Sequence, residues 1–162
     1  MNYTIITKNN FEAVADIYRA GIKTGNATFE TTIPSYKEWD KKHLPFGRIA
    51  LVEHKNIVGW ASLSAVSNRC VYNGVAEVSV YVSALAQGKG VGTKLLHKLI
   101  DISESEGIWT LQCGIMRENT ASISLHKKCG FREIGYREKV GKLKGVWRDN
   151  IIMERRSKII GI

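Results

Sequence analysis

A run of three glycines, Gln87-Gly88-Lys89-Gly90-Val91-Gly92-Thr93, separates a strand-like segment at residues 75–82 from an amphipathic helical segment. The first backbone N–H groups of a helix have no partner within it, and the helix dipole adds partial positive charge at that end. Glycines allow positive φ and leave these N–H groups open to a bulky anion, and the Thr93 hydroxyl can join them. The run therefore predicts a binding site for a phosphate group.

The spacing of the glycines excludes two common phosphate-binding loops. A dinucleotide-binding G-x-G-x-x-G loop requires glycine at position 93, which is threonine, and no glycine of the run has the Walker spacing to Lys and Ser or Thr. The run reads instead as Gln87-x-x-Gly90-x-Gly92. This pattern resembles the (Arg/Gln)-x-x-Gly-x-(Gly/Ala) loop by which GNAT N-acetyltransferases hold the pyrophosphate of acetyl-CoA; a glycine-rich turn without a ligand is the alternative.

A second segment carries the same resemblance. Residues 119–131, NTASISLHKKCGF, are similar to the GNAT pattern N-x-x-(A/S)-x-x-L-(Y/H)-x-x-x-G-F and follow the glycine run at the expected distance. Most of the chain resembles the phosphinothricin and methionine-sulfone acetyltransferase branch, with matches at residues 27–30, 77–82, 124–126 and 141–149. That branch acetylates the α-amino group of small amino-acid-like compounds, so the resemblance implies an acetyl-CoA-dependent acyltransferase with a small-molecule amine acceptor.

The chemistry of this reaction requires a base. An amine must lose a proton before it attacks a thioester, because an ammonium group has no lone pair. The resemblance makes Glu77, on the strand that leads to the glycine run, this base, acting directly or through a water molecule. A surface carboxylate on a half-exposed strand is the alternative for this residue.

The leaving group also needs assistance. The CoA thiol has a pKa near that of cysteine, about 8.5, so a proton or a hydrogen bond helps the thiolate to depart. The resemblance assigns this role to His126, where many relatives have tyrosine and the amino-acid-acetylating branch has histidine. A helix histidine that caps a neighbouring polar group is the alternative.

The resemblance further implies which residues hold acetyl-CoA. The backbone of Val80, Tyr81 and Val82 is expected to pair with the pantetheine arm, and one N–H to stabilise the thioester oxyanion. Asn119 is expected to bind the cofactor, to cap the following helix, or to do both. The pyrophosphate contacts are expected from the whole glycine run, that is from Gln87, Gly88, Lys89, Gly90, Val91, Gly92 and Thr93.

On the acceptor side the resemblance implies Phe29, Arg69 and Tyr72. A guanidinium group suits a carboxylate or phosphinate, although a solvated loop arginine is the alternative. The chain departs from the branch at residues 141–145, GKLKG, and at residues 116–118, MRE. Both segments border the expected acceptor pocket, so the identity of the acceptor stays open.

Composition narrows the possible partners. The 24 Lys and Arg residues exceed the 15 Asp and Glu residues, which gives a formal net charge of +9 and favours anionic ligands. The basic residues are scattered, and no helix-turn-helix or aromatic-basic RNA motif accompanies them, so we expect no nucleic acid partner. Acetylation of a protein or peptide amine, and a CoA-binding sensor without catalysis, remain alternatives to a small-molecule enzyme.

Cysteine and histidine spacing argues against metal or thiol chemistry. Cys70, Cys113 and Cys129 lack C-x-x-C spacing, and the four histidines include no H-E-x-x-H pair, so we expect no metal and no acyl-enzyme. Without a long apolar run or a secretory leader, we expect a cytoplasmic protein with no membrane partner. The resemblance implies a homodimer with sites near the interface.

The periodicity of the chain predicts the elements that position these residues. Gly25 is expected to end the first helix, which Asn9 or Asn10 caps, and Ser35 to Glu38 has capping-box spacing. The expected order is β-α-α-β-β-β-α-β-α-β-β in a single domain over residues 1–162. The resemblance specifies an α/β (α+β) GNAT fold, with a mixed, mostly antiparallel sheet of about seven strands flanked by four helices. Strands are expected at 3–7, 49–53, 57–65, 75–82, 110–115, 131–140 and 146–153, and helices near 10–24, 35–39, 91–106 and 120–129.

Overall fold

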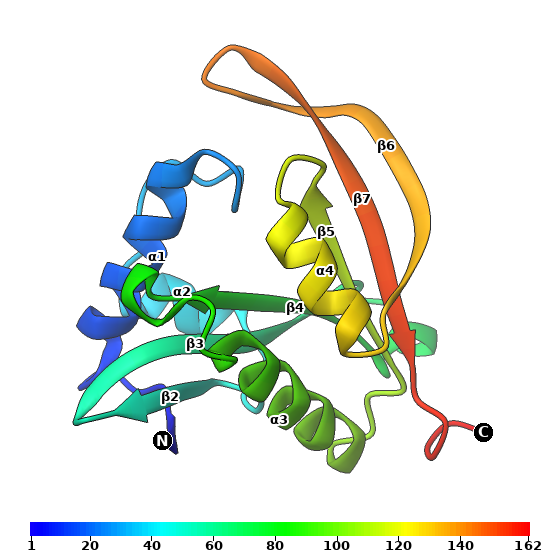
Figure 1. Cartoon of the computed structure of the whole chain (residues 1–162). Coiled ribbons are helices and arrows are strands. Elements are labelled where there is room, and N and C mark those ends of the chain that lie inside the picture. Colours follow the sequence, from blue (N-terminus) through cyan, green and yellow to red (C-terminus); the bar gives the residue numbers. More distant parts are fainter.

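The computed structural model describes all 162 residues and has the expected order of elements (Figure 1). The strands are β1 (Asn2–Ile5), β2 (Ile49–Glu53), β3 (Asn56–Ala65), β4 (Val75–Val82), β5 (Thr110–Met116), β6 (Arg132–Leu143) and β7 (Val146–Arg156). The α-helices are α1 (Phe11–Thr24), α2 (Tyr36–Lys42), α3 (Val91–Ser105) and α4 (Thr120–Lys128). Two short 3₁₀ turns that the sequence did not predict, η1 (Cys70–Tyr72) and η2 (Ala84–Ala86), flank β4.

The seven strands form one sheet in the order β1-β2-β3-β4-β5-β7-β6. All neighbours are antiparallel except β4 and β5, whose parallel ladder contains only three pairs, from Val75 opposite Thr110 to Glu77 opposite Gln112. Beyond Glu77 the two strands diverge, as Figure 1 shows. The rest of β4 therefore presents one backbone edge to the space between the two halves of the sheet.

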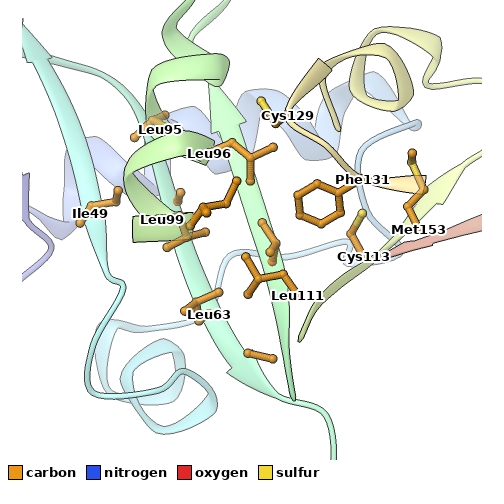
Figure 2. Close-up of a cluster of buried hydrophobic side chains, with 14 of the residues drawn as sticks. Ile49, Leu63, Leu95, Leu96, Leu99, Leu111, Cys113, Cys129, Phe131 and Met153 are labelled. Carbon is orange, nitrogen blue, oxygen red and sulfur yellow. The ribbon is translucent and has the colours of Figure 1, made fainter. Parts of the chain in front are cut away.

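One face of the sheet packs against α3. Leu95, Leu96 and Leu99 of α3 are fully buried and lie against side chains of β2, β3 and β5 (Figure 2). They belong to a cluster of 20 buried residues that also holds Cys113, Cys129 and Phe131. The apolar positions that recur with helical period in the sequence are therefore the core face of this helix.

The opposite face is covered by α1 and α2 over a smaller, aromatic cluster. Trp39 of α2 and Trp60 of β3 are each 1% exposed, and the Trp60 ring stacks on Tyr81 of β4 with centroids 4.7 Å apart. Such offset aromatic contacts add to the stabilisation from buried area alone. The side chain of Tyr81 thus fixes β4 against the helical layer, and its backbone remains at the divergent edge.

Local signals placed most element ends correctly, and the exceptions have clear causes. Gly25 adopts the left-handed conformation at φ +69° and ends α1, and Ser35 forms the predicted capping box with Glu38. Asn10, one of the two predicted candidates, is the N-cap residue of α1, but its side chain does not cap the helix and instead accepts from the Thr7 N–H and donates to Ile5 O. The prediction of a loop at 141–145 was too long: β6 continues to Leu143, and Lys144 and Gly145, both with positive φ, make the hairpin turn.

No helix of the structure is both long enough and apolar enough to cross a bilayer.

Candidate active site

A cavity of about 1740 Å³ opens between the two halves of the sheet, where β4 and β5 diverge. Helices α1 to α4, strands β3 to β7 and the glycine run all contribute to its wall. Most of the predicted site residues line it: Phe29, Glu77, Val80, Tyr81, Val82, Gln87, Gly88, Gly90, Val91, Gly92, Thr93, Asn119 and His126. Lys89, Arg69 and Tyr72 do not.

The glycine run forms an open helix N-terminus on this cavity. The first hydrogen bond of α3 joins the Lys94 N–H to Gly90 O at 3.1 Å, and no side chain caps the helix. The N–H groups of Val91, Gly92 and Thr93 therefore precede the first helical bond and are available to an anion. The side chain of Val91 is buried in the core, so only its backbone can serve a ligand.

The three glycines are needed for two different reasons. Gly88 and Gly90 have φ of +75° and +74°, which other residues rarely adopt, and open space surrounds the position of a Cβ at each. Gly92 is helical, and a Cβ there would stand 2.9 Å from Leu125 Cδ2 of α4. Gly92 therefore lets α4 approach α3, whereas Gly88 and Gly90 shape the loop.

Glu77 occupies the point at which β4 and β5 part. Its side chain is exposed to the cavity, in the last pair of the short parallel ladder with Gln112. Burial, and secondarily the Glu77 carboxylate, raise the pKa of the neighbouring Cys113 thiol to about 12. Cys113 is therefore a protonated thiol beside the carboxylate and not an activated nucleophile.

His126 is a buried, neutral imidazole on the same cavity. Its Nδ1 lies 2.8 Å from the carbonyl oxygen of Ser122, and a carbonyl can only accept, so Nδ1 carries the proton. Its Nε2 is buried and has no partner. Burial lowers the pKa of His126, and the weaker effect of the Ser122 hydrogen bond opposes this shift. The resting side chain thus offers a lone pair at Nε2.

Asn119 joins the helix α4 to the loop after α1. Its Oδ1 accepts from the Ser122 N–H at 3.2 Å, which confirms the predicted N-cap, and its Nδ2 donates to Asn26 O at 3.3 Å. The side chain is thus held from both ends at the cavity wall.

The sequence also matches the family model of the acetyltransferase (GNAT) family over residues 11–131. The chain belongs to the GNAT family. It is 31% identical over 159 residues to the L-methionine sulfoximine/L-methionine sulfone acetyltransferase of Salmonella typhimurium, covering 95% of this chain and 93% of that protein. The resemblance inferred from the two motifs is confirmed.

Solved structures agree with this assignment. The phosphinothricin acetyltransferase from Sinorhizobium meliloti in complex with AcCoA has a TM-score of 0.85, 27% identity and coverage of 99% and 95% of the two chains. The ribosomal-protein-alanine N-acetyltransferase from Brucella melitensis has a TM-score of 0.89, 27% identity and coverage of 97% and 100%. The chain is thus an acetyl-CoA-dependent GNAT N-acetyltransferase, and the predicted seven-stranded fold is confirmed.

The loop after α1, residues 25–30, carries the predicted acceptor residue Phe29, and we call it the acceptor loop. Residues 26–30 of this loop line the cavity. Phe29 packs on Gly141 of β6, where a Cβ would stand 2.7 Å from the ring. Arg69 and Tyr72 lie on the β3–β4 connection, where Arg69 Cζ is 5.6 Å from the centroid of the Tyr72 ring. Unlike Phe29, neither residue lines the cavity of its own chain.

Sequence reasoning missed the residues that hold the acceptor loop. Arg148 of β7 donates to Gly25 O and Asn26 Oδ1, and it also pairs with Glu118 before α4. The only signal was that residues 116–118 depart from the branch pattern, and this signal did not indicate a partner. The two hydrogen bonds from Arg148 to the acceptor loop join positions more than 100 residues apart, so no local spacing in the sequence indicates them.

The loop geometry generates a test of the pyrophosphate site. Replacing Gly90→Val forces a β-branched residue to φ near +74°, which costs about 1–3 kcal/mol and displaces the N–H groups of α3. We expect calorimetry to detect no acetyl-CoA binding. Gly107→Val is the matched control, because Gly107 has φ +80° and open space beyond the other end of α3. Equal affinity in the Gly90 variant and the wild type would contradict the assignment.

The state of His126 can be read by ¹⁵N NMR, with its signal assigned by its loss in His126→Gln. We expect a neutral ring protonated at Nδ1 at pH 7, and a pKa below the usual value of about 6.5. At pH values between the folded and the unfolded pKa of His126, the unfolded chain binds more protons than the folded chain. The contribution of His126 to the free energy of unfolding therefore rises with pH in this range and is lost in acid. A charged ring at pH 7, or a proton on Nε2 of the neutral ring, would refute this description.

Proposed function

We propose that this enzyme transfers acetyl from acetyl-CoA to the amino group of a small amino-acid-like acceptor, of the phosphinothricin, methionine sulfone or methionine sulfoximine type. The observation that carries this proposal is that Glu77 lines the same cavity as the open N-terminus of α3 and the acceptor loop, at the point where β4 and β5 part. The names of the relatives support the acceptor class, because they act on or are named for such compounds.

Binding of the donor follows from unpaired backbone groups. The N–H groups at the start of α3 would hold the pyrophosphate, and the free edge of β4 from Val80 to Val82 would pair with the pantetheine amides. Asn119 would add a side-chain contact from α4. This arrangement would lay the thioester across the gap that separates β4 from β5, next to Glu77.

The amine must lose two protons during the transfer, and two residues can accept them. Glu77 takes the first proton from the ammonium group of the acceptor, directly or through water, and releases it to solvent. As the new N–C bond forms and the C–S bond breaks, the nitrogen loses a second proton. His126 begins neutral with a free Nε2, so it must first accept this proton before it gives it to the sulfur. The protonated Cys113 takes no part, which favours direct attack in a ternary complex.

Composition, length and residue spacing lead us to infer a single domain over residues 1–162 in a cytoplasmic protein with no metal, no nucleic acid and no membrane partner. The resemblance to the branch leads us to infer a homodimer. Arg69 and Tyr72 remain predicted acceptor residues, and Lys89 a predicted donor residue. Acetylation of a peptide N-terminus is the second candidate, because the ribosomal-protein-alanine N-acetyltransferase is similar over 97% of this chain.

A substrate screen tests the proposal. Release of the CoA thiol is followed with acetyl-CoA and, in turn, phosphinothricin, methionine sulfone, methionine sulfoximine, polyamines and peptides. We expect turnover with the amino-acid-like compounds. Turnover of peptides alone would favour the second candidate, and acetyl-CoA binding without turnover of any amine would indicate a sensor.

The role of Glu77 is tested by Glu77→Gln, which keeps the shape of the side chain and removes the base. We expect kcat to fall by about 10²–10⁴-fold, with the Kd for acetyl-CoA unchanged within about twofold. Cys113→Ala should retain activity, because its thiol is protonated and buried. A parallel loss of turnover and acetyl-CoA affinity in Glu77→Gln would eliminate Glu77 as the base.

A further inference from the structure

Two pairs of oppositely charged residues cross between the start of α4 and strand β7. Arg117 and Glu118 precede α4, and Arg148 and Asp149 lie on β7. Arg117 approaches the Asp149 carboxylate at 3.6 Å, and its N–H donates to Asp149 O at 3.1 Å; Arg148 pairs with Glu118 at 3.0 Å. We call these four residues the charge clamp. Two of its members, Arg117 and Glu118, belong to a segment in which the sequence departs from its branch.

Arg148 carries more contacts than the ion pair. Its guanidinium also donates to Gly25 O at 2.7 Å and to Asn26 Oδ1 at 2.5 Å, and its side chain is 14% exposed. A carbonyl can only accept, and the planar guanidinium supplies several donors in a fixed fork, so no other side chain reproduces this set. The beginning of the acceptor loop is therefore fastened to β7.

The acceptor loop is also held by a residue at the N-terminus of α4. Asn119 Nδ2 donates to Asn26 O, and Asn119 is the N-cap of α4. Asn26 thus lies between Arg148 on β7 and Asn119 on α4. Glu118, the residue before Asn119, pairs with Arg148, so the two anchors of Asn26 lie side by side.

The far part of the loop depends on the clamp as well. Asp149 accepts from the Tyr136 hydroxyl and from the Lys139 N–H, and Lys139 lies in the irregular stretch of β6 between Arg137 and Gly141. The ring of Phe29 rests on Gly141 at the end of that stretch. One assembly of side chains therefore determines the position of both Asn26 and Phe29.

Arg148 itself does not reach the cavity, although Asn26, Phe29, Glu118 and Asn119 line it. We propose that Arg148 is a positioning residue, which sets the affinity for the acceptor by fastening the acceptor loop to β7 and to the N-terminus of α4, without touching either substrate. This inference rests on the proposed function, since it takes the acceptor to bind against residues 26–30. It explains why the altered segment at residues 116–118 matters for the acceptor half of the site.

The test compares Arg148→Met with Arg155→Met. Arg155 lies on the same strand, is 23% exposed, and pairs with one carboxylate, Glu104, at the same distance of 3.0 Å, but it does not line the active-site cavity. We expect Arg148→Met to raise the acceptor KM by at least about tenfold, with kcat within about threefold and the acetyl-CoA Kd within about twofold of wild type. Arg155→Met should change stability without this effect on KM.

Two conservative variants separate the loop contacts from the ion pair. Glu118→Gln removes the charge of the pair and leaves the bonds from Arg148 to the loop, so the amides of residues 25–30 should exchange with solvent as slowly as in wild type. Arg148→Lys keeps the charge but loses the fork, so its acceptor KM should be raised as in Arg148→Met. Exchange in Glu118→Gln as fast as that in Arg148→Met would overturn the inference, as would a wild-type acceptor KM in Arg148→Lys.

Hydrogen exchange on the free enzyme gives a readout independent of any acceptor. The amides of residues 25–30 should exchange faster in Arg148→Met and Arg148→Lys than in wild type and Arg155→Met. Unchanged exchange would overturn the inference. If the wild type acetylates no amino-acid-like amine, the proposed function fails, and the exchange result still decides whether Arg148 fastens the loop.

Discussion

The separation of β4 from β5 after three parallel pairs is the constraint on which the rest of this structure depends. Beyond Glu77, β4 continues beside β3, and β5 continues beside β7, so each half of the sheet keeps one complete ladder. The edge of β4 that faces the gap has backbone groups without a strand partner, and buried backbone groups require one. An extended ligand with amides satisfies this requirement, and the open N-terminus of α3 at the end of β4 supplies the anion site beside it.

The gap also determines the electrostatics of the chemistry. Side chains at its edge range from the exposed Glu77 to the buried His126 and Cys113, and burial lowers the pKa of His126 while it raises the pKa of Cys113. A carboxylate that faces solvent can pass protons on, whereas a buried imidazole with a bound Nδ1 proton starts as an acceptor. The same burial keeps Cys113 protonated. The thiol next to Glu77 is therefore not an activated nucleophile.

The two halves of the site are supported differently. The proposed donor half depends on the backbone: two glycines with positive φ, bare N–H groups and a free strand edge. The proposed acceptor half depends on side chains from distant segments: Arg148 and Asn119 donate hydrogen bonds to Asn26, and Phe29 packs on Gly141. Backbone geometry tolerates changes in sequence, and side-chain networks do not, so related enzymes can share a donor site and differ in their acceptors.

The sequence by itself determined the order of the elements, the glycine loop and the family, because helical period, left-handed glycines and capping boxes depend on neighbouring residues alone. It placed Asn10 at the start of α1 but did not determine its side-chain bonds, since several partners compete for one amide side chain. Only the tertiary structure decided that Arg69 and Tyr72 lie apart from the cavity of their chain, that His126 is neutral with a free Nε2, and that Arg148 holds the acceptor loop. These features depend on burial and on contacts between segments far apart in the chain, which form only when the whole sheet has assembled.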